Sequence, residues 1–475
     1  MSMNSQLTMK KFIAVVFLIS LILGLIFAIP VLLNPEGAYQ PDSYGYESLA
    51  FSLLNTQEFP SLGRTPVYPF FICMTYAVFG HKPRAIVCVQ VILSALAVIF
   101  VCLIGKIIWN LRIGMIGGLV YAINPLRLYY STQILTESFF TLLILIGVYY
   151  FLLTIKQKRP ISIILSGLFF ALAVLCRPIG ILLPIILAVL IIFFLKVSLR
   201  IRLFYSITFL LVYICLLVPW AVRNYLAYNV FTVSSVSYFM FLTSDGTAVI
   251  AERDQLSIDE SIQKLEKEIK RERLKNNSSL RQEDVESIYS DKNFRYSAEF
   301  RKLAIKIGAR IIKENPLLIL KIHLTGMIKT LAHPPLGIFE LQRYLYGADY
   351  RGGIDKMDKE VRDRLISEAR IKELFKIIRQ RFGGVPLSVK FIWILLVLFM
   401  VFQYVALFLS LIFFIKEPGT RKYLILLLII IAYFVFLPGF IGSSRFRVPV
   451  EPYLSILSGI GLGVVLKKHK KAEAV

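Results

Sequence analysis

Long apolar runs separated by short polar segments dominate the chain. A helix that crosses a bilayer needs roughly 20 apolar residues, and runs of about that length recur along the sequence. The first run is too long for the apolar part of a signal peptide, which has about 7–15 residues, and no small-residue cleavage site follows it, so we expect it to be a retained span. We expect ten spans, near residues 12–33, 85–109, 113–131, 133–155, 161–177, 178–196, 203–221, 391–415, 422–441 and 448–466.

Two apolar runs, 67–79 and 317–331, are shorter, and we expect them to be interfacial or re-entrant. With ten spans and a cytoplasmic N-terminus, the groups of basic residues between the spans all face the cytoplasm, as the positive-inside rule requires. Counting either short run as a span would place several of these groups outside. They are Lys10/Lys11, Lys106/Arg112, Lys156/Lys158/Arg159, Lys196/Arg200/Arg202, Lys416/Arg421/Lys422 and Lys467/Lys468/Lys470/Lys471.

This pattern predicts an all-α polytopic membrane protein in three parts. Residues 1–221 form a membrane module with a first outer loop at 34–84, and residues 391–475 add further spans and a basic cytoplasmic tail. Residues 222–390 form a polar, mostly helical insert on the extracytoplasmic side. We expect a multi-pass protein of the plasma or inner membrane whose active site faces that side.

The insert contains segments with helical periodicity. Within 257–276, the apolar residues Ile258, Ile262, Leu265 and Ile269 recur on one face of a helix. The segments 302–313 and 357–382 are also typical of helices. The insert is too polar to cross a membrane, so we expect a helical layer over the outer opening of the membrane module.

Composition agrees with the membrane class, because 57% of the residues are hydrophobic and the mean hydropathy is +0.70. The net charge of +24 has two interpretations, which are anchoring against anionic membrane lipids and binding of an anionic substrate at the outer face. The basic residues are scattered over many loops without a nucleic-acid-binding motif, so no nucleic-acid partner is predicted.

Cysteine and histidine residues do not form a recognisable metal site. The cysteines lie in apolar segments without CxxC spacing, and the histidines form no HExxH or HxH pattern. The sequence therefore predicts no metal ligands among these residues: Cys73, Cys88, Cys102, Cys176, Cys215, His81, His323, His333 and His469.

Two acids are candidate catalytic residues. Asp42 follows the first span, and it is either the N-cap of the helix-like stretch that follows or a general base for an acceptor hydroxyl. Glu137 lies near the outer end of the fourth expected span. It is either an interfacial residue solvated by headgroups or a functional group, because an ionisable residue within a span is costly and usually marks a site.

Arginine and tyrosine residues of the same face complete the candidate site. Arginine binds phosphate through two parallel hydrogen bonds, although an arginine at the end of a span also snorkels to the interface without any such role. Arg177 belongs to this outer set. The candidate phosphate ligands are Arg64, Arg223, Arg445 and Arg447, and Tyr46 and Tyr68 are candidate contacts of the sugar or the acceptor.

Several motifs follow one another in a characteristic order. They are PDSYGYESLAFSLL, RTPVYPFF, NPLRLYYSTQILTESFF, CRPIG, PWAVRNY and SSRFRVPVEPY. In their order and spacing the chain resembles the GT-C fold glycosyltransferases of the family that includes the protein O-mannosyltransferases and the lipid A aminoarabinose transferase. The resemblance covers most of the membrane region, whereas the insert 222–390 departs from it except loosely at 315–335.

The resemblance implies a polyprenyl-phosphate-linked sugar donor, inverting transfer and an active site at the outer face. Asp42 matches the acid of the first outer loop, which acts as a base or lies beside a metal, and Glu137 matches a second motif acid. Many members have an Asp-Glu pair where this chain has Asp42-Ser43, which weakens the case for a required divalent metal. No cofactor is predicted with certainty and a divalent metal stays possible, and the acceptor class stays open among lipid, glycan and protein.

The alternative functions are a transporter of lipid-linked sugars and a catalytically silent subunit. A transporter or flippase of lipid-linked sugars often shows internal repeats and polar residues at mid-membrane, and neither is clear in this chain. A catalytically silent subunit of an envelope assembly line is the other alternative, and the presence of both candidate acids argues against it.

Overall fold

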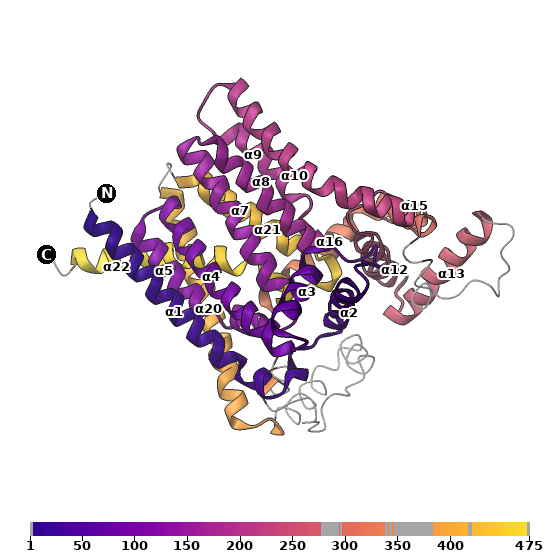
Figure 1. Cartoon of the computed structure of the whole chain (residues 1–475), viewed down its shortest axis with the longest axis horizontal. Coiled ribbons are helices and arrows are strands. Elements are labelled where there is room, and N and C mark those ends of the chain that lie inside the picture. Colours follow the sequence, from indigo (N-terminus) through magenta and orange to yellow (C-terminus); the bar gives the residue numbers. More distant parts are fainter. Residues whose placement is uncertain are drawn as a thin grey trace.

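The computed structural model confirms the all-α class (Figure 1). It describes residues 3–276, 294, 297–337, 341, 344–345, 383–416 and 420–472. Every regular element in these ranges is helical. The two ends of the chain lie at the same end of the helix bundle, and the helices of the polar insert lie at the other end (Figure 1).

Five helices are long and apolar enough to cross a membrane. The span of α7 has 72% of its most apolar window buried inside the protein, compared with 17% in α20. Because α7 is central, a polar residue at its end is surrounded by protein. The five are α1 (Met3–Leu33), α4 (Pro83–Ile108), α7 (Glu137–Gln157), α10 (Leu199–Tyr228) and α20 (Leu387–Lys416).

Shorter apolar helices fill the remaining membrane region. They are α3 (Val67–Phe79), α5 (Leu111–Ala122), α8 (Pro160–Cys176), α9 (Leu183–Phe194) and α21 (Arg421–Phe436), and beside them lies α22 (Glu451–Ala472), which has 22 residues compared with 21 in α7. The expected number of ten spans stays a prediction, because several of these helices are shorter than the roughly 20 residues that a straight crossing needs.

One of the expected spans does not form a single helix. The run 113–131 is divided into α5 and a separate short helix, α6 (Pro125–Ser131). Pro125 cannot continue the preceding helix, and the side chain of Asn124 accepts a hydrogen bond from the backbone N–H of Arg127 at 3.0 Å. The Asn-Pro pair therefore ends one helix and begins the next, which bends the chain ahead of α7.

The polar insert forms a helical layer with an apolar core of its own. Leu265 and Ile269 are buried in this core, so the amphipathic face expected in 257–276 is confirmed, as is the helix expected at 302–313. The helix expected at 357–382 lies outside the described residues. The layer consists of α11 (Val236–Met240), the π-helical η3 (Phe241–Gly246), α12 (Thr247–Asp254), α13 (Ile258–Asn276), α15 (Ala298–Glu314) and α16 (Pro316–Ala332).

The expected domain boundaries fall inside helices. The helix α10 continues to Tyr228, past the boundary at 222, and α20 begins at Leu387, before the boundary at 391. The membrane helices α10 and α20 therefore extend into the range expected for the insert at both of its ends.

The insert also contacts the loop between α21 and α22 at very close range. A methyl group on Gly326 of α16 would overlap the carbonyl oxygen of Gly439, and one on Gly442 would overlap the carbonyl oxygen of Gly326. The side chain of Asp245 accepts a hydrogen bond from the backbone N–H of Phe440 at 3.1 Å. This junction fixes the loop 437–447 against α16.

Candidate functional site

The candidate site begins at the N-terminus of α2 (Pro41–Asn55), directly after the short helix η1 (Pro35–Ala38). The helix has Gln40 as its N-cap, so the interpretation of Asp42 as the N-cap is wrong. The Ser43 hydroxyl donates to the carbonyl of Ile134 at 2.8 Å, and the Gln40 side chain donates to Gln133 at 2.8 Å. These bonds tie the start of α2 to the segment that leads into α7, which places Asp42 beside the first turn of that helix.

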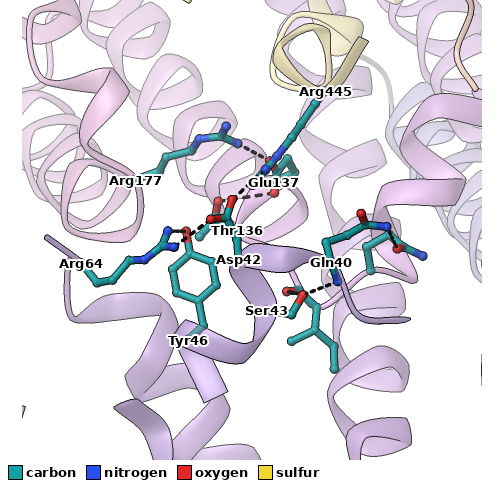
Figure 2. A network of polar contacts seen from close by, with 11 residues as sticks. Gln40, Asp42, Ser43, Tyr46, Arg64, Thr136, Glu137, Arg177 and Arg445 are labelled. Atoms are coloured by element: carbon teal, nitrogen blue, oxygen red, sulfur yellow. Dashed lines mark hydrogen bonds and ion pairs between the residues drawn. The ribbon is translucent and has the colours of Figure 1, made fainter. Parts of the chain in front are cut away.

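Five charged side chains meet at this point (Figure 2). Arg64 donates to Oδ1 of Asp42 at 2.7 Å, and Arg445 donates to Oδ2 at 2.8 Å. Arg445 also pairs with Glu137 through its Nε, and Arg177 donates to the same Glu137 oxygen at 2.5 Å. We call these five residues the charge cluster.

The members of the charge cluster come from separate segments of the chain. Asp42 lies in α2, Arg64 precedes α3, Glu137 begins α7, and Arg177 ends α8 before η2 (Pro178–Gly180). Arg445 lies in η7 (Ser444–Arg447), which follows η6 (Gly439–Ile441) in the loop that contacts the insert. The site therefore forms only when the N-terminal and C-terminal membrane helices pack together.

Exposure differs sharply between the two acids. The side chain of Glu137 has no exposed surface, whereas that of Asp42 is 35% exposed and those of Arg64 and Arg445 are 30% and 26% exposed. The interpretation of Glu137 as a solvated interfacial residue is therefore wrong. Glu137 holds two guanidinium groups from the buried side of the charge cluster, and Asp42 lies on its solvent-accessible side.

The electrostatics of Asp42 result from opposing effects. Partial burial alone raises its pKa, but the positive charges and hydrogen bonds of Arg64 and Arg445 outweigh burial and lower the pKa to about 2. The carboxyl group is therefore ionised at neutral pH. With three guanidinium groups facing two carboxylates, the charge cluster carries a net positive charge, which favours an anionic ligand.

Of the two candidate tyrosines, one lies in the cluster and one behind it. The Tyr46 hydroxyl accepts a hydrogen bond from Arg64 at 3.0 Å, and the guanidinium carbon of Arg64 lies 4.5 Å from the centre of the Tyr46 ring. Tyr68 is fully buried, packs edge-on against Tyr46 with 5.0 Å between ring centres, and donates to Gln90 at 2.5 Å. Tyr68 therefore supports the position of the Tyr46 ring.

Arg223 lies outside the charge cluster. Its guanidinium donates to the carbonyl oxygens of Phe59 and Ser61 and lies 5.0 Å from the centre of the Trp220 ring. These contacts fix the loop that leads to Arg64. Arg223 therefore affects the site by holding this backbone segment in position.

Arg447 is also placed elsewhere, although it is only two residues from Arg445. It is 1% exposed, pairs with Glu451 at 2.7 Å, and donates to the carbonyl oxygens of Leu331 at 2.9 Å and His333 at 2.8 Å. These contacts join the end of α16 to the start of α22. The spacing of Arg447 and Glu451, four residues apart, was the signal in the sequence for this pair.

A divalent metal does not fit the donors at the site. The oxygens of Asp42 and one oxygen of Glu137 accept from arginine, and the hydroxyl of the adjacent Ser43 donates to a backbone carbonyl. Among the described residues no three His, Cys, Asp or Glu side chains converge as a metal site would require.

Comparison with solved structures identifies the fold. The chain is similar to the archaeal oligosaccharyltransferase AglB from Archaeoglobus fulgidus in complex with an inhibitory peptide and a dolichol-phosphate, with a TM-score of 0.52 at 16% identity over 100% of this chain and 52% of that one. The apo form of the Archaeoglobus fulgidus oligosaccharyltransferase gives a TM-score of 0.51 at 14% identity, with the same coverage. The chain thus spans about half the length of these structures.

The fold is therefore that of the GT-C membrane glycosyltransferases. Within this class, residues 63–222 match the family model of the dolichyl-phosphate-mannose-protein mannosyltransferases. The matched stretch contains Arg64, Glu137 and Arg177 of the charge cluster. ArnT from Cupriavidus metallidurans aligns at 10% identity with a TM-score of 0.38, over 97% of this chain and 78% of that one. No curated protein sequence gives a significant match.

Proposed function

We propose that the protein is an inverting glycosyltransferase that moves a sugar from a polyprenyl-phosphate donor to an acceptor hydroxyl at the extracytoplasmic face of the cell membrane. The observation that carries the proposal is the charge cluster, in which a partly exposed carboxylate lies between arginines at the end of a central membrane helix. The GT-C fold and the dolichol-phosphate bound by the AglB structure support the donor class.

The arginines suit the phosphate of the donor. Arg64 and Arg445 are the more exposed guanidinium groups of the cluster, and guanidinium presents a planar pair of donors to phosphate oxygens. Buried Glu137 holds Arg445 and Arg177 in place, so that the positive charge is fixed before the donor arrives. Fixed charge at the leaving group stabilises the negative charge that develops on the phosphate in the transition state.

Asp42 is the proposed base. It takes the proton of the acceptor hydroxyl, the acceptor oxygen forms a bond to the anomeric carbon, and the bond from that carbon to the phosphate oxygen breaks on the opposite face. The polyprenyl phosphate leaves with the bonding electron pair, and the anomeric carbon is inverted. A phosphate needs no general acid to leave, unlike the alcohol released in glycoside hydrolysis, so one carboxylate is sufficient.

A transfer assay separates this proposal from a transporter and from a silent subunit. Membranes containing the protein are incubated with a panel of radiolabelled polyprenyl-phosphate sugars, and labelled product is compared with that of membranes lacking it. We expect label in a lipid, glycan or protein acceptor for one of these donors. Movement of the intact labelled donor across the membrane, without any transfer, would contradict the proposal.

Replacing Arg445 by Ala should weaken binding of the donor. A charge-assisted contact contributes about 1.5–3 kcal/mol, so the affinity for the donor should fall roughly 10–150-fold. Lys in place of Arg445 should restore only part of the affinity, because the ammonium lacks the planar pair of donors. The measurement is equilibrium binding of the lipid donor in detergent micelles, and an unchanged affinity in the Ala variant would remove Arg445 from the site.

The proposed orientation predicts labelling of the insert from outside the cell. Lys267 lies on the exposed face of α13, so a Lys267→Cys variant should react with a membrane-impermeant maleimide in intact cells. The unsubstituted chain is the control for its own cysteines. Reaction only after permeabilisation would reverse the assigned orientation.

A further inference from the structure

The loop that carries Arg445 begins at the C-terminal end of α21, where α16 of the insert lies against it (Figure 1). Two side chains of the insert hold the backbone at this point. Asp245 of η3 accepts a hydrogen bond from the N–H of Phe440 at 3.1 Å, and His323 of α16 bonds through Nδ1 to the carbonyl oxygen of Phe436 at 2.9 Å. The turn from α21 into η6 is therefore held on both of its sides.

Gly439 lies between these two bonds and brings the backbone close to both side chains. Its φ is +54°, in the left-handed region that favours glycine. A methyl group on Gly439 would overlap Oδ1 of Asp245 and would lie 3.1 Å from the His323 ring. Because both side chains pack directly on this backbone, a shift of either one shifts the turn.

The position of this turn determines where Arg445 lies. Beyond the turn the loop is fixed a second time at Arg447, which is buried and pairs with Glu451. Arg445 lies between the two fixed points, and from there it reaches Asp42 and Glu137. Release of the turn would therefore leave Arg445 anchored on one side only.

The contact between Asp245 and His323 depends on one proton. A carbonyl oxygen only accepts, so Nδ1 of His323 carries a hydrogen and donates it to Phe436. Nε2 of the same ring faces Oδ2 of Asp245 at 3.9 Å, which is ion-pair distance. When the histidine is neutral and the acid is ionised, two lone pairs face each other. A proton on Nε2 or on Oδ2 makes the contact attractive.

The surroundings favour the protonated pair. Both side chains are only 12% exposed, and burial raises the pKa of Asp245, although the N–H of Phe440 and the charge of His323 oppose this. A raised pKa in the folded protein contributes stability that is present at low pH and is lost as the pH rises. The other charged side chains around the pair are Glu252 of α12, which pairs with Lys321, and Lys329, which lies over the Phe440 ring.

We propose that Asp245 and His323 are positioning residues for donor binding, and that loss of the proton between them releases the turn and withdraws Arg445 from the phosphate. This inference rests on the proposed role of Arg445 as a ligand of the donor phosphate. The affinity for the donor should then fall as the pH rises through the range of about 5 to 8, in which histidine changes its charge. The insert thereby makes the site sensitive to the pH on its own side of the membrane.

Equilibrium titration with polyprenyl methyl phosphate in detergent micelles tests this inference. The phosphodiester keeps one negative charge over the whole range, whereas a monophosphate gains a second charge near about pH 6. Between about pH 5 and 8 the affinity of the unsubstituted protein should fall about 3–5-fold, as is typical of losing an ion pair that solvent still reaches. An affinity that does not change with pH would overturn the proposal.

His323→Asn removes the proton and keeps the bond to the loop. The amide NH2 group takes the place of Nδ1–H as the donor to Phe436 and does not titrate. The affinity of this variant should equal the lower, alkaline value of the unsubstituted protein at every pH. The same fall in the variant as in the unsubstituted protein would contradict the role of His323.

Two other histidines provide matched controls. His333 caps the C-terminus of the same helix, is exposed, and bonds to the carbonyl oxygen of Pro334. His81 is 57% exposed and lies 3.3 Å from Glu47 of α2. His333→Asn and His81→Asn should both keep the fall in affinity. If either variant abolishes it, the titration belongs to that histidine and the proposal is wrong.

Asp245→Asn tests the other member of the pair. Its amide oxygen still accepts from the N–H of Phe440, and its NH2 group faces Nε2 of His323 as a donor. This variant should hold the turn with the neutral histidine, so the loss of affinity at alkaline pH should disappear. A loss as large as in the unsubstituted protein would contradict the proposal.

Hydrogen exchange of the peptide 437–447 separates the positioning of the loop from the proposed function. After correction for the intrinsic effect of pH, exchange in the unsubstituted protein should be faster at the alkaline end of the range, and in His323→Asn it should not change. If exchange responds in this way while polyprenyl methyl phosphate does not bind at any pH, the hold on the loop stands and the proposed donor site is wrong. If the lipid binds while neither affinity nor exchange depends on pH, the positioning role is wrong and the proposed function stands.

Discussion

Asp42→Asn is expected to reduce sugar transfer by on the order of 10²–10⁴, because an amide does not accept the proton of the acceptor hydroxyl. The amide has nearly the size of the carboxylate and keeps one oxygen that accepts a hydrogen bond from Arg64 or Arg445, while its NH2 group replaces the oxygen that accepted from the other. The helix α2 has its N-cap at Gln40, so capping is unaffected. The measurement is the initial rate of transfer at saturating donor and acceptor.

The expected loss must not result from misfolding. Asp42 in the first turn of α2 interacts favourably with the helix dipole, but this contributes only about 0.3–1 kcal/mol. The Asp42→Asn variant should therefore elute as a folded protein with a melting temperature close to that of the unsubstituted chain. Transfer at the full rate in this variant would rule out Asp42 as the base.

Arg447→Ala is expected to destabilise the protein by about 3–5 kcal/mol, the typical cost of breaking a buried ion pair by removing one partner. Glu451 would then lose the cation at 2.7 Å and keep its hydrogen bonds from Asn124 at 2.7 Å and Gln403 at 3.0 Å. The backbone carbonyls at the end of α16 would also lose their donor. Unfolding of the purified variant in detergent measures the effect.

Arg445→Ala is the matched variant two residues away. It removes the same side chain from the same short helix, but Arg445 is 26% exposed and faces the charge cluster. We expect Arg445→Ala to lower donor affinity with a small change in melting temperature, and Arg447→Ala to lower the melting temperature. The reverse pattern would show that the two roles are exchanged.

The sequence was sufficient for the class of fold and for several local elements. Apolar runs of span length predict the five long apolar helices, and the spacing of Leu265 and Ile269 predicts the buried face of α13. The order of the motifs predicts a GT-C protein, because that order follows the order of its helices. Asp42, Glu137 and Arg445 were also identified as members of one face.

The sequence was insufficient where packing between distant segments decides the outcome. Arg445 and Arg447 are chemically identical, and only the short helix η7 directs one to Asp42 and the other to Glu451. The burial of Glu137 depends on the position of Arg177 and Arg445, which follow it by 40 and 308 residues. No local pattern encodes these distances. The break at Asn124, by contrast, has a local signal in its Asn-Pro pair, which the expected span 113–131 did not take into account.

The backbone contact between Gly326 and the loop 437–442 has a consequence for building chimeras. An insert taken from a relative and grafted between α10 and α20 would bring its own version of α16, and its fit would depend on a loop encoded about a hundred residues downstream. Any graft that ignores this loop would shift Arg445 away from Asp42 even with every residue of the charge cluster retained. The insert and the loop 437–447 should therefore be exchanged together, as one unit of recombination.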